Sequence, residues 1–71
     1  MDNLERAEIA ASAAVLWASF TDNERGMIRF GMFPAGKMQA AERELSHIRD
    51  HTRLLAVALM NEAKRDGGMR A

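Results

Sequence analysis

The stretch Phe20-Thr21-Asp22-Asn23-Glu24 divides this chain of 71 residues into helices. Thr21 and Glu24 have the spacing of a capping box, in which the threonine hydroxyl and the glutamate carboxylate satisfy each other's free backbone amides. A capping box marks the start of a helix. We therefore expect one helix to end near Phe20 and another to begin at about Asp22.

The helix that begins there is expected to be short, covering residues 22–30. Gly26 weakens it, and Gly31 is a natural C-cap because glycine adopts the left-handed conformation without strain. Pro34 can then occupy the first position of a third helix, where its missing N–H would be unpaired in any residue.

A first helix is expected over residues 3–20, with Asp2 or Asn3 as its N-cap. Apolar residues recur along it at helical spacing and include Ile9, Ala13, Leu16, Trp17 and Phe20. Six alanines between residues 7 and 18 leave room for another helix to approach closely.

After the turn at Pro34, one long helix is expected over residues 34–65, ended by Gly67-Gly68 and followed by a flexible tail at 67–71. Its apolar positions alternate in steps of three and four, as in a heptad seam. The seam runs through Met38, Ala41, Leu45, Ile48, Thr52, Leu55 and Leu59. Around residues 54–60 the helix is apolar on nearly all sides and needs cover on more than one face.

A third helix of this length would run about 45 Å, against about 27 Å for the first helix. Because one layer of helices cannot cover it, we expect an all-α, single-domain chain over residues 1–71. Its form would be a helical hairpin with a short middle helix, dimerising into a four-helix-like bundle. The expected core and dimer seam comprises Leu45, Ile48, Thr52, Leu55, Leu59, Leu16, Trp17 and Phe20.

Composition supports the helical interpretation and excludes several classes of protein. Apolar residues make up 48% of the chain and charged residues 28%, which is typical of a globular protein. Without cysteine, neither a disulfide framework nor a thiolate zinc site is possible. The acidic start of the chain does not resemble a secretory signal, and the apolar stretch at 9–20 is too short to span a bilayer, so we expect a cytoplasmic protein.

The net charge of zero conceals a segregation of charge. Residues 1–24 carry a net charge of −4 and residues 25–71 carry +4. Opposite ends of this kind suit an antiparallel packing, within one chain or between two, and argue against a basic surface for nucleic acid. The alternative is that these charges only solvate the helix faces.

The most unusual segment is Gly26–Phe33, in which five large apolar residues lie between glycines. Methionine and phenylalanine on a small element can form an adaptable protein-binding surface, or they can simply cover the open end of a bundle. The expected partner-binding residues are Met27, Ile28, Arg29, Phe30, Met32 and Phe33, with Arg25 and Lys37 providing electrostatic selectivity. Those cations could instead hold a phosphate or a nucleotide, although no phosphate-binding glycine pattern is present.

His47 and His51 stand four residues apart, so a continuous helix would place both on one face, with Glu44 one turn before. Two histidines at this spacing can hold zinc or nickel, but nothing supplies a further ligand, and we predict neither a metal nor a cofactor. The serines have no activating neighbours and no paired-carboxylate cleft is recognisable, which argues against an enzyme. The long acidic-faced helix has the wrong shape for a DNA reader.

The runs 20–25 and 32–35, with the ending 58–68, resemble small helical accessory proteins of temperate bacteriophages and prophages. The resemblance covers about half of the chain and implies a compact protein of a class that includes inhibitors of host regulators and defence systems. We therefore expect a non-enzymatic module that forms a homodimer and binds a host protein. Sequestration of an anionic nucleotide and a structural assembly subunit are the alternatives.

Overall fold

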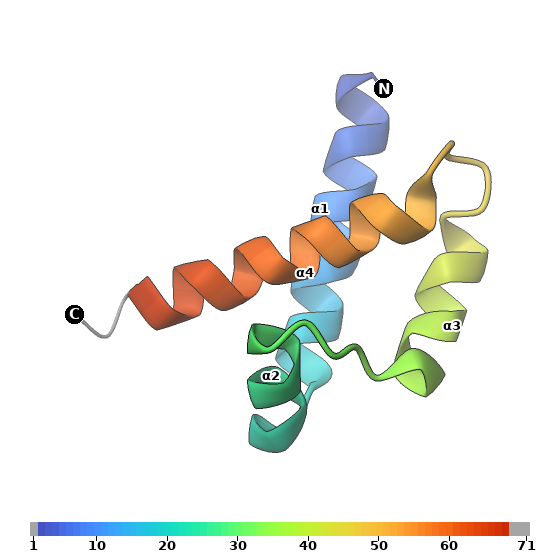
Figure 1. Cartoon of the computed structure of the whole chain (residues 1–71). Coiled ribbons are helices and arrows are strands. Elements are labelled where there is room, and N and C mark those ends of the chain that lie inside the picture. Colours follow the sequence, from blue (N-terminus) through green and yellow to red (C-terminus); the bar gives the residue numbers. More distant parts are fainter. Residues whose placement is uncertain (1, 69–71) are drawn as a thin grey trace.

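The computed structural model describes residues 2–68 and contains four α-helices and no strand within that range (Figure 1). They are α1 (Asn3–Ser19), α2 (Asp22–Arg29), α3 (Ala35–Glu44) and α4 (His51–Gly68). The all-α prediction is confirmed. Of the tail expected at 67–71, residues 67 and 68 belong to α4 and the rest lie outside the described residues.

The first two helices begin and end close to where the sequence predicts. The carboxylate of Asp2 accepts a hydrogen bond from the backbone N–H of Glu5 and caps α1. Phe20 is extended, and α2 then starts with a complete capping box. In that box, Glu24 N–H donates to the Thr21 hydroxyl at 3.2 Å and Thr21 N–H donates to the Glu24 carboxylate at 2.8 Å.

The prediction of one long helix over 34–65 is wrong. The chain leaves the helix after Glu44, and a turn over residues 45–50 separates α3 from α4. Asp50 adopts a left-handed conformation with φ of 62°, which aspartate tolerates better than most residues. Leu45 and Ile48, both almost fully buried, belong to this turn rather than to a helical seam.

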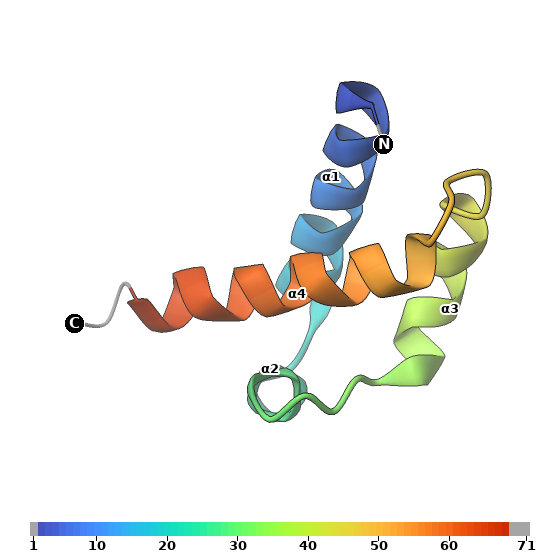
Figure 2. The same cartoon turned by 45° about the horizontal axis from the view of Figure 1, so that its top comes forward.

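The break lets one chain cover its own core. In Figures 1 and 2, α4 crosses α1 steeply, with α2 and α3 packed at the two sides of this crossing. The buried side chains come from all four helices, the α1–α2 connection and the 45–50 turn: Ile9, Ala13, Phe20, Ile28, Met38, Leu45, Ile48, Leu55, Leu59 and Ala63. Leu16, Trp17 and Ala41 are half-buried against them. Residues 34–65 therefore form no single long helix for a second chain to cover.

One member of the expected seam is misplaced. Thr52 is exposed in the first turn of α4, whereas Leu55 and Leu59 are fully buried. The heptad assignment fails at Thr52 because the turn before it resets the phase of the helix.

Candidate protein-binding surface

Three large apolar side chains stand exposed at the C-terminal end of α2. Phe30 is 84% exposed, Met32 54% and Met27 39%. We call these three residues the α2 surface. All three belong to the segment that the sequence singles out as a binding surface.

The α2 surface is held by a Schellman motif. Met32 N–H donates to the Met27 carbonyl at 2.9 Å, and Gly31 N–H donates to the Ile28 carbonyl at 2.8 Å. Gly31 has a φ of 79°, as this motif requires. The six-to-one hydrogen bond places the two methionines at the same end of the helix. Phe30, at the C-cap between them, projects into solvent.

Two other apolar residues of the segment turn inward, which corrects their assignment to the binding surface. Ile28 is fully buried and forms part of the core. Phe33 is half-buried and packs against the core. The segment therefore serves both interpretations at once: Ile28 and Phe33 cover the interior, and Met27, Phe30 and Met32 remain outside.

Arg25 contacts the last turn of α1. Its guanidinium donates from Nε to the Trp17 carbonyl at 3.0 Å and from Nη2 to the Ala18 carbonyl at 3.4 Å. These carbonyls belong to the last turn of α1, where backbone acceptors have no helical partner. No basic residue lies in that turn of α1 itself, so α2 supplies the cation that the helix dipole favours.

Lys37, at the start of α3, also reaches the end of α1. Its ammonium donates to the Ser19 carbonyl at 3.3 Å and to the Glu24 carboxylate at 2.8 Å, and it lies 5.8 Å from the Phe20 ring centre. The Lys37 ammonium and the backbone N–H of Thr21 hold the pKa of Glu24 below its usual value, because both stabilise the ionised carboxylate.

Arg29 joins α2 to the end of α4. It forms an ion pair with Asp66 at 2.8 Å, between residues 37 positions apart in the sequence. The guanidinium groups of Arg25 and Arg29 lie 5.6 and 5.8 Å from the centre of the Trp17 ring. The three cations expected to select a partner or an anion thus all contact groups of this chain.

The two histidines do not share a helix face, which corrects the geometry considered for a metal. His47 lies in the 45–50 turn and its ring bonds to the Glu8 carboxylate, whereas His51 begins α4 and its ring bonds to the Ile48 carbonyl. Among residues 2–68, no group of three potential metal ligands is close enough to hold an ion.

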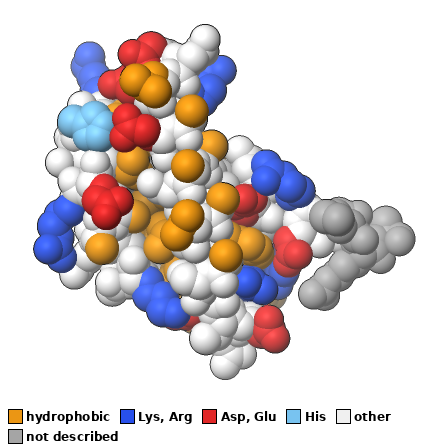
Figure 3. Space-filling model, turned by 180° about the vertical axis from the view of Figure 1, so that it is seen from behind, with side chains coloured by type: hydrophobic (Ala, Val, Ile, Leu, Met, Phe, Trp, Pro, Cys, Tyr) orange, Lys and Arg blue, Asp and Glu red, His pale blue; other side chains and the backbone are white. Residues whose placement is uncertain are grey.

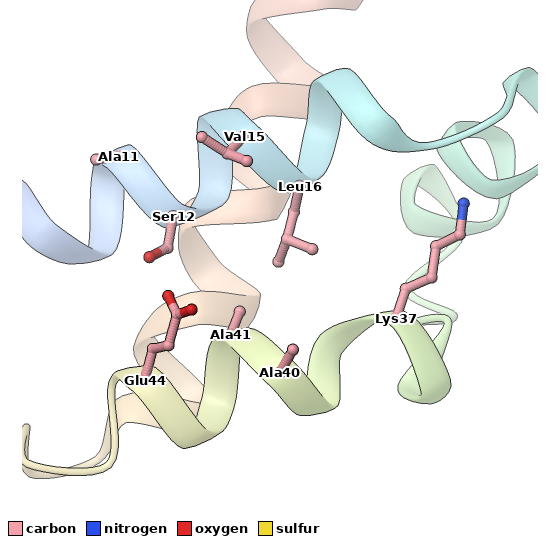
Figure 4. A pocket seen from close by; sticks show the side chains of 8 residues that line it. All are labelled: Ala11, Ser12, Val15, Leu16, Lys37, Ala40, Ala41 and Glu44. Carbon is pink, nitrogen blue, oxygen red and sulfur yellow. The ribbon is translucent and has the colours of Figure 1, made fainter.

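A shallow groove between α1 and α3 is a feature that the sequence analysis missed. It encloses about 320 Å³. Figure 4 shows Ser12 and Leu16 of α1 directed toward α3, with Ala40 and Ala41 opposite them. Lys37 stands at one end of the groove and Glu44 at the other. The signal in the sequence was the alanines on both helices, which keep the groove open.

Comparisons with protein-family models, curated proteins and solved structures found no significant match. Within the described residues, no helix is both long and apolar enough to cross a membrane.

Proposed function

We propose that this protein acts without catalysis, by binding another protein through the α2 surface. The observation that carries the proposal is the exposure of Phe30, which is 84% exposed at the C-cap of α2, between Met27 and Met32 in the chain. Aromatic residues dominate the energetics of protein interfaces, and methionines adapt to the shape of a partner. Because Phe30 contributes little to the core, its exposure is more readily explained by binding than by folding.

The resemblance to phage accessory proteins is the basis for the choice of partner. We propose a host regulatory or defence protein, bound in the bacterial cytoplasm, with this chain as its modulator. Arg29 borders the α2 surface and is about one-third exposed, so it can exchange Asp66 for an acidic group of the partner. We assign Arg25 and Lys37 to the stabilisation of the end of α1 rather than to the choice of partner.

The anion-sequestering alternative receives less support from the geometry. It requires Arg25, Arg29 and Lys37 to converge on a ligand, and each instead contacts a carbonyl or carboxylate of this chain. The assembly-subunit alternative would need contacts that join copies into larger oligomers, for which the α2 surface alone is small.

The experiment compares capture of bacterial host proteins by the wild type, by Phe30→Ala and by a control, Val57→Ala. Val57 is 48% exposed on α4, so its truncation removes apolar surface elsewhere on the molecule. For any captured protein, then purified, we expect Phe30→Ala to weaken binding by about 30-fold, as for an interface hot spot. Val57→Ala should change it by less than about 2-fold.

Two results would contradict the proposal. One is a set of captured proteins that does not depend on Phe30. The other is loss of helicity in Phe30→Ala, measured by circular dichroism, which would make Phe30 a structural residue. A parallel Arg29→Ala variant is expected to weaken binding while it leaves the helicity unchanged.

A further inference from the structure

The outer face of α1 carries an apolar stripe that no other part of residues 2–68 covers. Its members are exposed and alternate in steps of three and four: Leu4, Ala7, Ala11, Ala14 and Ala18. Val15 lies beside the stripe and is 71% exposed, and Leu4 is 73% exposed. The core-facing residues Ile9 and Ala13 lie on the opposite side of the helix. In Figure 3, which shows the molecule from behind, apolar side chains extend from the top of this face to its centre.

Steps of three and four are the spacing with which one helix packs along another. Alanine at four of the five positions lets two helix axes approach to about 8 Å, the lower end of the usual range. The groove between α1 and α3 lies along the same face, because Ala11 and Val15 of α1 both line it (Figure 4). Together the stripe and the groove form an elongated apolar surface with room for one additional helix. We call it the α1 surface.

We propose that α1 of a second copy of the chain packs on the α1 surface, in an antiparallel dimer with its two-fold axis near Ala11. Ala11 is the midpoint of the stripe, so a two-fold axis there pairs Leu4 with Ala18 of the second copy. Leu4, the largest side chain of each stripe, then packs against the small Ala18 of the other copy. A parallel pair would instead oppose Leu4 to Leu4 and leave a gap between the two copies of Ala18.

The charges select the same orientation. Asp2, Glu5 and Glu8 crowd the N-terminal end of α1, with Arg6 as the one basic residue there. A parallel pair would superpose the two acidic ends, and like charges at such distances repel. The antiparallel pair separates them by roughly 20 Å, more than a Debye length in physiological salt. It places each acidic end beside the far end of α1, where Lys37 and Arg25 offset the charges of Glu24 and Asp22.

The dimer differs from the one expected from the sequence. That dimer was to be built on the long third helix, whose apolar residues the fold of a single chain already buries. Here the two copies meet through α1, with α3 of each chain beside α1 of the other. The α2 surface takes no part in this contact, so each copy can bind a partner independently.

The first test measures mass by sedimentation from about 10 µM to about 1 mM protein. We expect the wild type to reach twice the chain mass of 7.9 kDa. Ala11→Arg should raise the dissociation constant of the dimer more than about 10-fold. Arginine is a good helix former, so α1 itself should persist. The matched control is Ala10→Arg, an identical change one position along, at the α1–α4 groove, and it should leave the dimer intact.

The second test fixes the orientation and needs only small substitutions, so it does not depend on how the fold tolerates arginine. The chain has no cysteine, so introduced thiols report only designed contacts. With copper phenanthroline as the oxidant, Ala11→Cys should form a disulfide-linked dimer with its own copy. Leu4→Cys alone should not, whereas an equimolar mixture of Leu4→Cys and Ala18→Cys should link the two variants.

Three outcomes would overturn the proposal: a wild type that is monomeric at about 1 mM, equal effects of Ala10→Arg and Ala11→Arg on the dimer, or efficient self-linking of Leu4→Cys. The partner-binding proposal is tested separately. Phe30→Ala should leave the dimer unchanged, and loss of dimerisation in Ala11→Arg should leave the α2 surface able to capture its partner.

Discussion

At the scale of single residues, the cations that look functional in the sequence hold the fold together. We predict that Arg25→Ala lowers the free energy of unfolding by about 1–2 kcal/mol, since it leaves the Trp17 and Ala18 carbonyls without their charged donor. Urea denaturation measures this change. Arg43→Ala, at an exposed position on α3, is the control and should stay within about 0.5 kcal/mol of the wild type. An equally small effect of Arg25→Ala would contradict the structural role of Arg25 and favour its role as a partner-binding residue.

Glu24 makes the stability depend on pH. Its pKa is lowered from 4.5 in the folded state, chiefly by the hydrogen bond from Lys37. The folded state thus favours the ionised form. The stabilisation is fully present above the unfolded pKa and is lost as the pH falls through the lower, folded value. Below pH 4.5, the urea concentration at the midpoint of unfolding should therefore decrease with falling pH more steeply for the wild type than for Glu24→Gln. Parallel curves for the two proteins would contradict this role.

At the scale of helices, those helix ends that depend on a local side-chain pattern were predictable from the sequence. The Thr21–Glu24 capping box and the Gly31 C-cap are local patterns, so they survive whatever the rest of the chain does. The end of α3 was not predictable in this way. Residues 45–50 contain neither glycine nor proline, and the chain leaves the helix where Leu45 and Ile48 enter the core. The apolar periodicity of the sequence continues through residues 45–50 because Leu45 and Ile48 would be buried in a continuous helix and are also buried in this turn.

The Schellman motif at the end of α2 gives two glycine substitutions opposite signs. Gly31→Ala should destabilise the protein by about 1 kcal/mol, because alanine pays for the left-handed φ of 79° that glycine adopts freely. Gly26→Ala, inside the same helix, should stabilise it by about 0.5–1 kcal/mol. A β-carbon at either position meets no atom within 4 Å, so the conformation alone decides the sign. Thermal unfolding followed by circular dichroism measures both, and equal signs would contradict the motif.

At the scale of the whole molecule, the sequence predicts the fold class but not the arrangement of the helices. Alanine and leucine content predicts helices, and most of the expected core residues, including Leu55 and Leu59, are buried. The arrangement depends on where the chain reverses. The turn at residues 45–50 converts a helix that would need a partner into two shorter helices that both pack against α1. The same turn separates His47 from His51 and moves Thr52 to the surface.

Substitutions at Ile48 and Thr52 distinguish the folded-back chain from a continuous helical seam, in which both residues would be buried. Ile48→Ala should lower the free energy of unfolding by about 2–4 kcal/mol, because it opens a cavity beneath the 45–50 turn. Thr52→Ala should change it by less than about 0.5 kcal/mol. Circular dichroism and the fluorescence of Trp17, the one tryptophan, should report a single coincident transition in both variants, as one shared core requires. Comparable losses at the two positions would favour the continuous helix, and separate transitions would mean that α1 and α4 do not share a core.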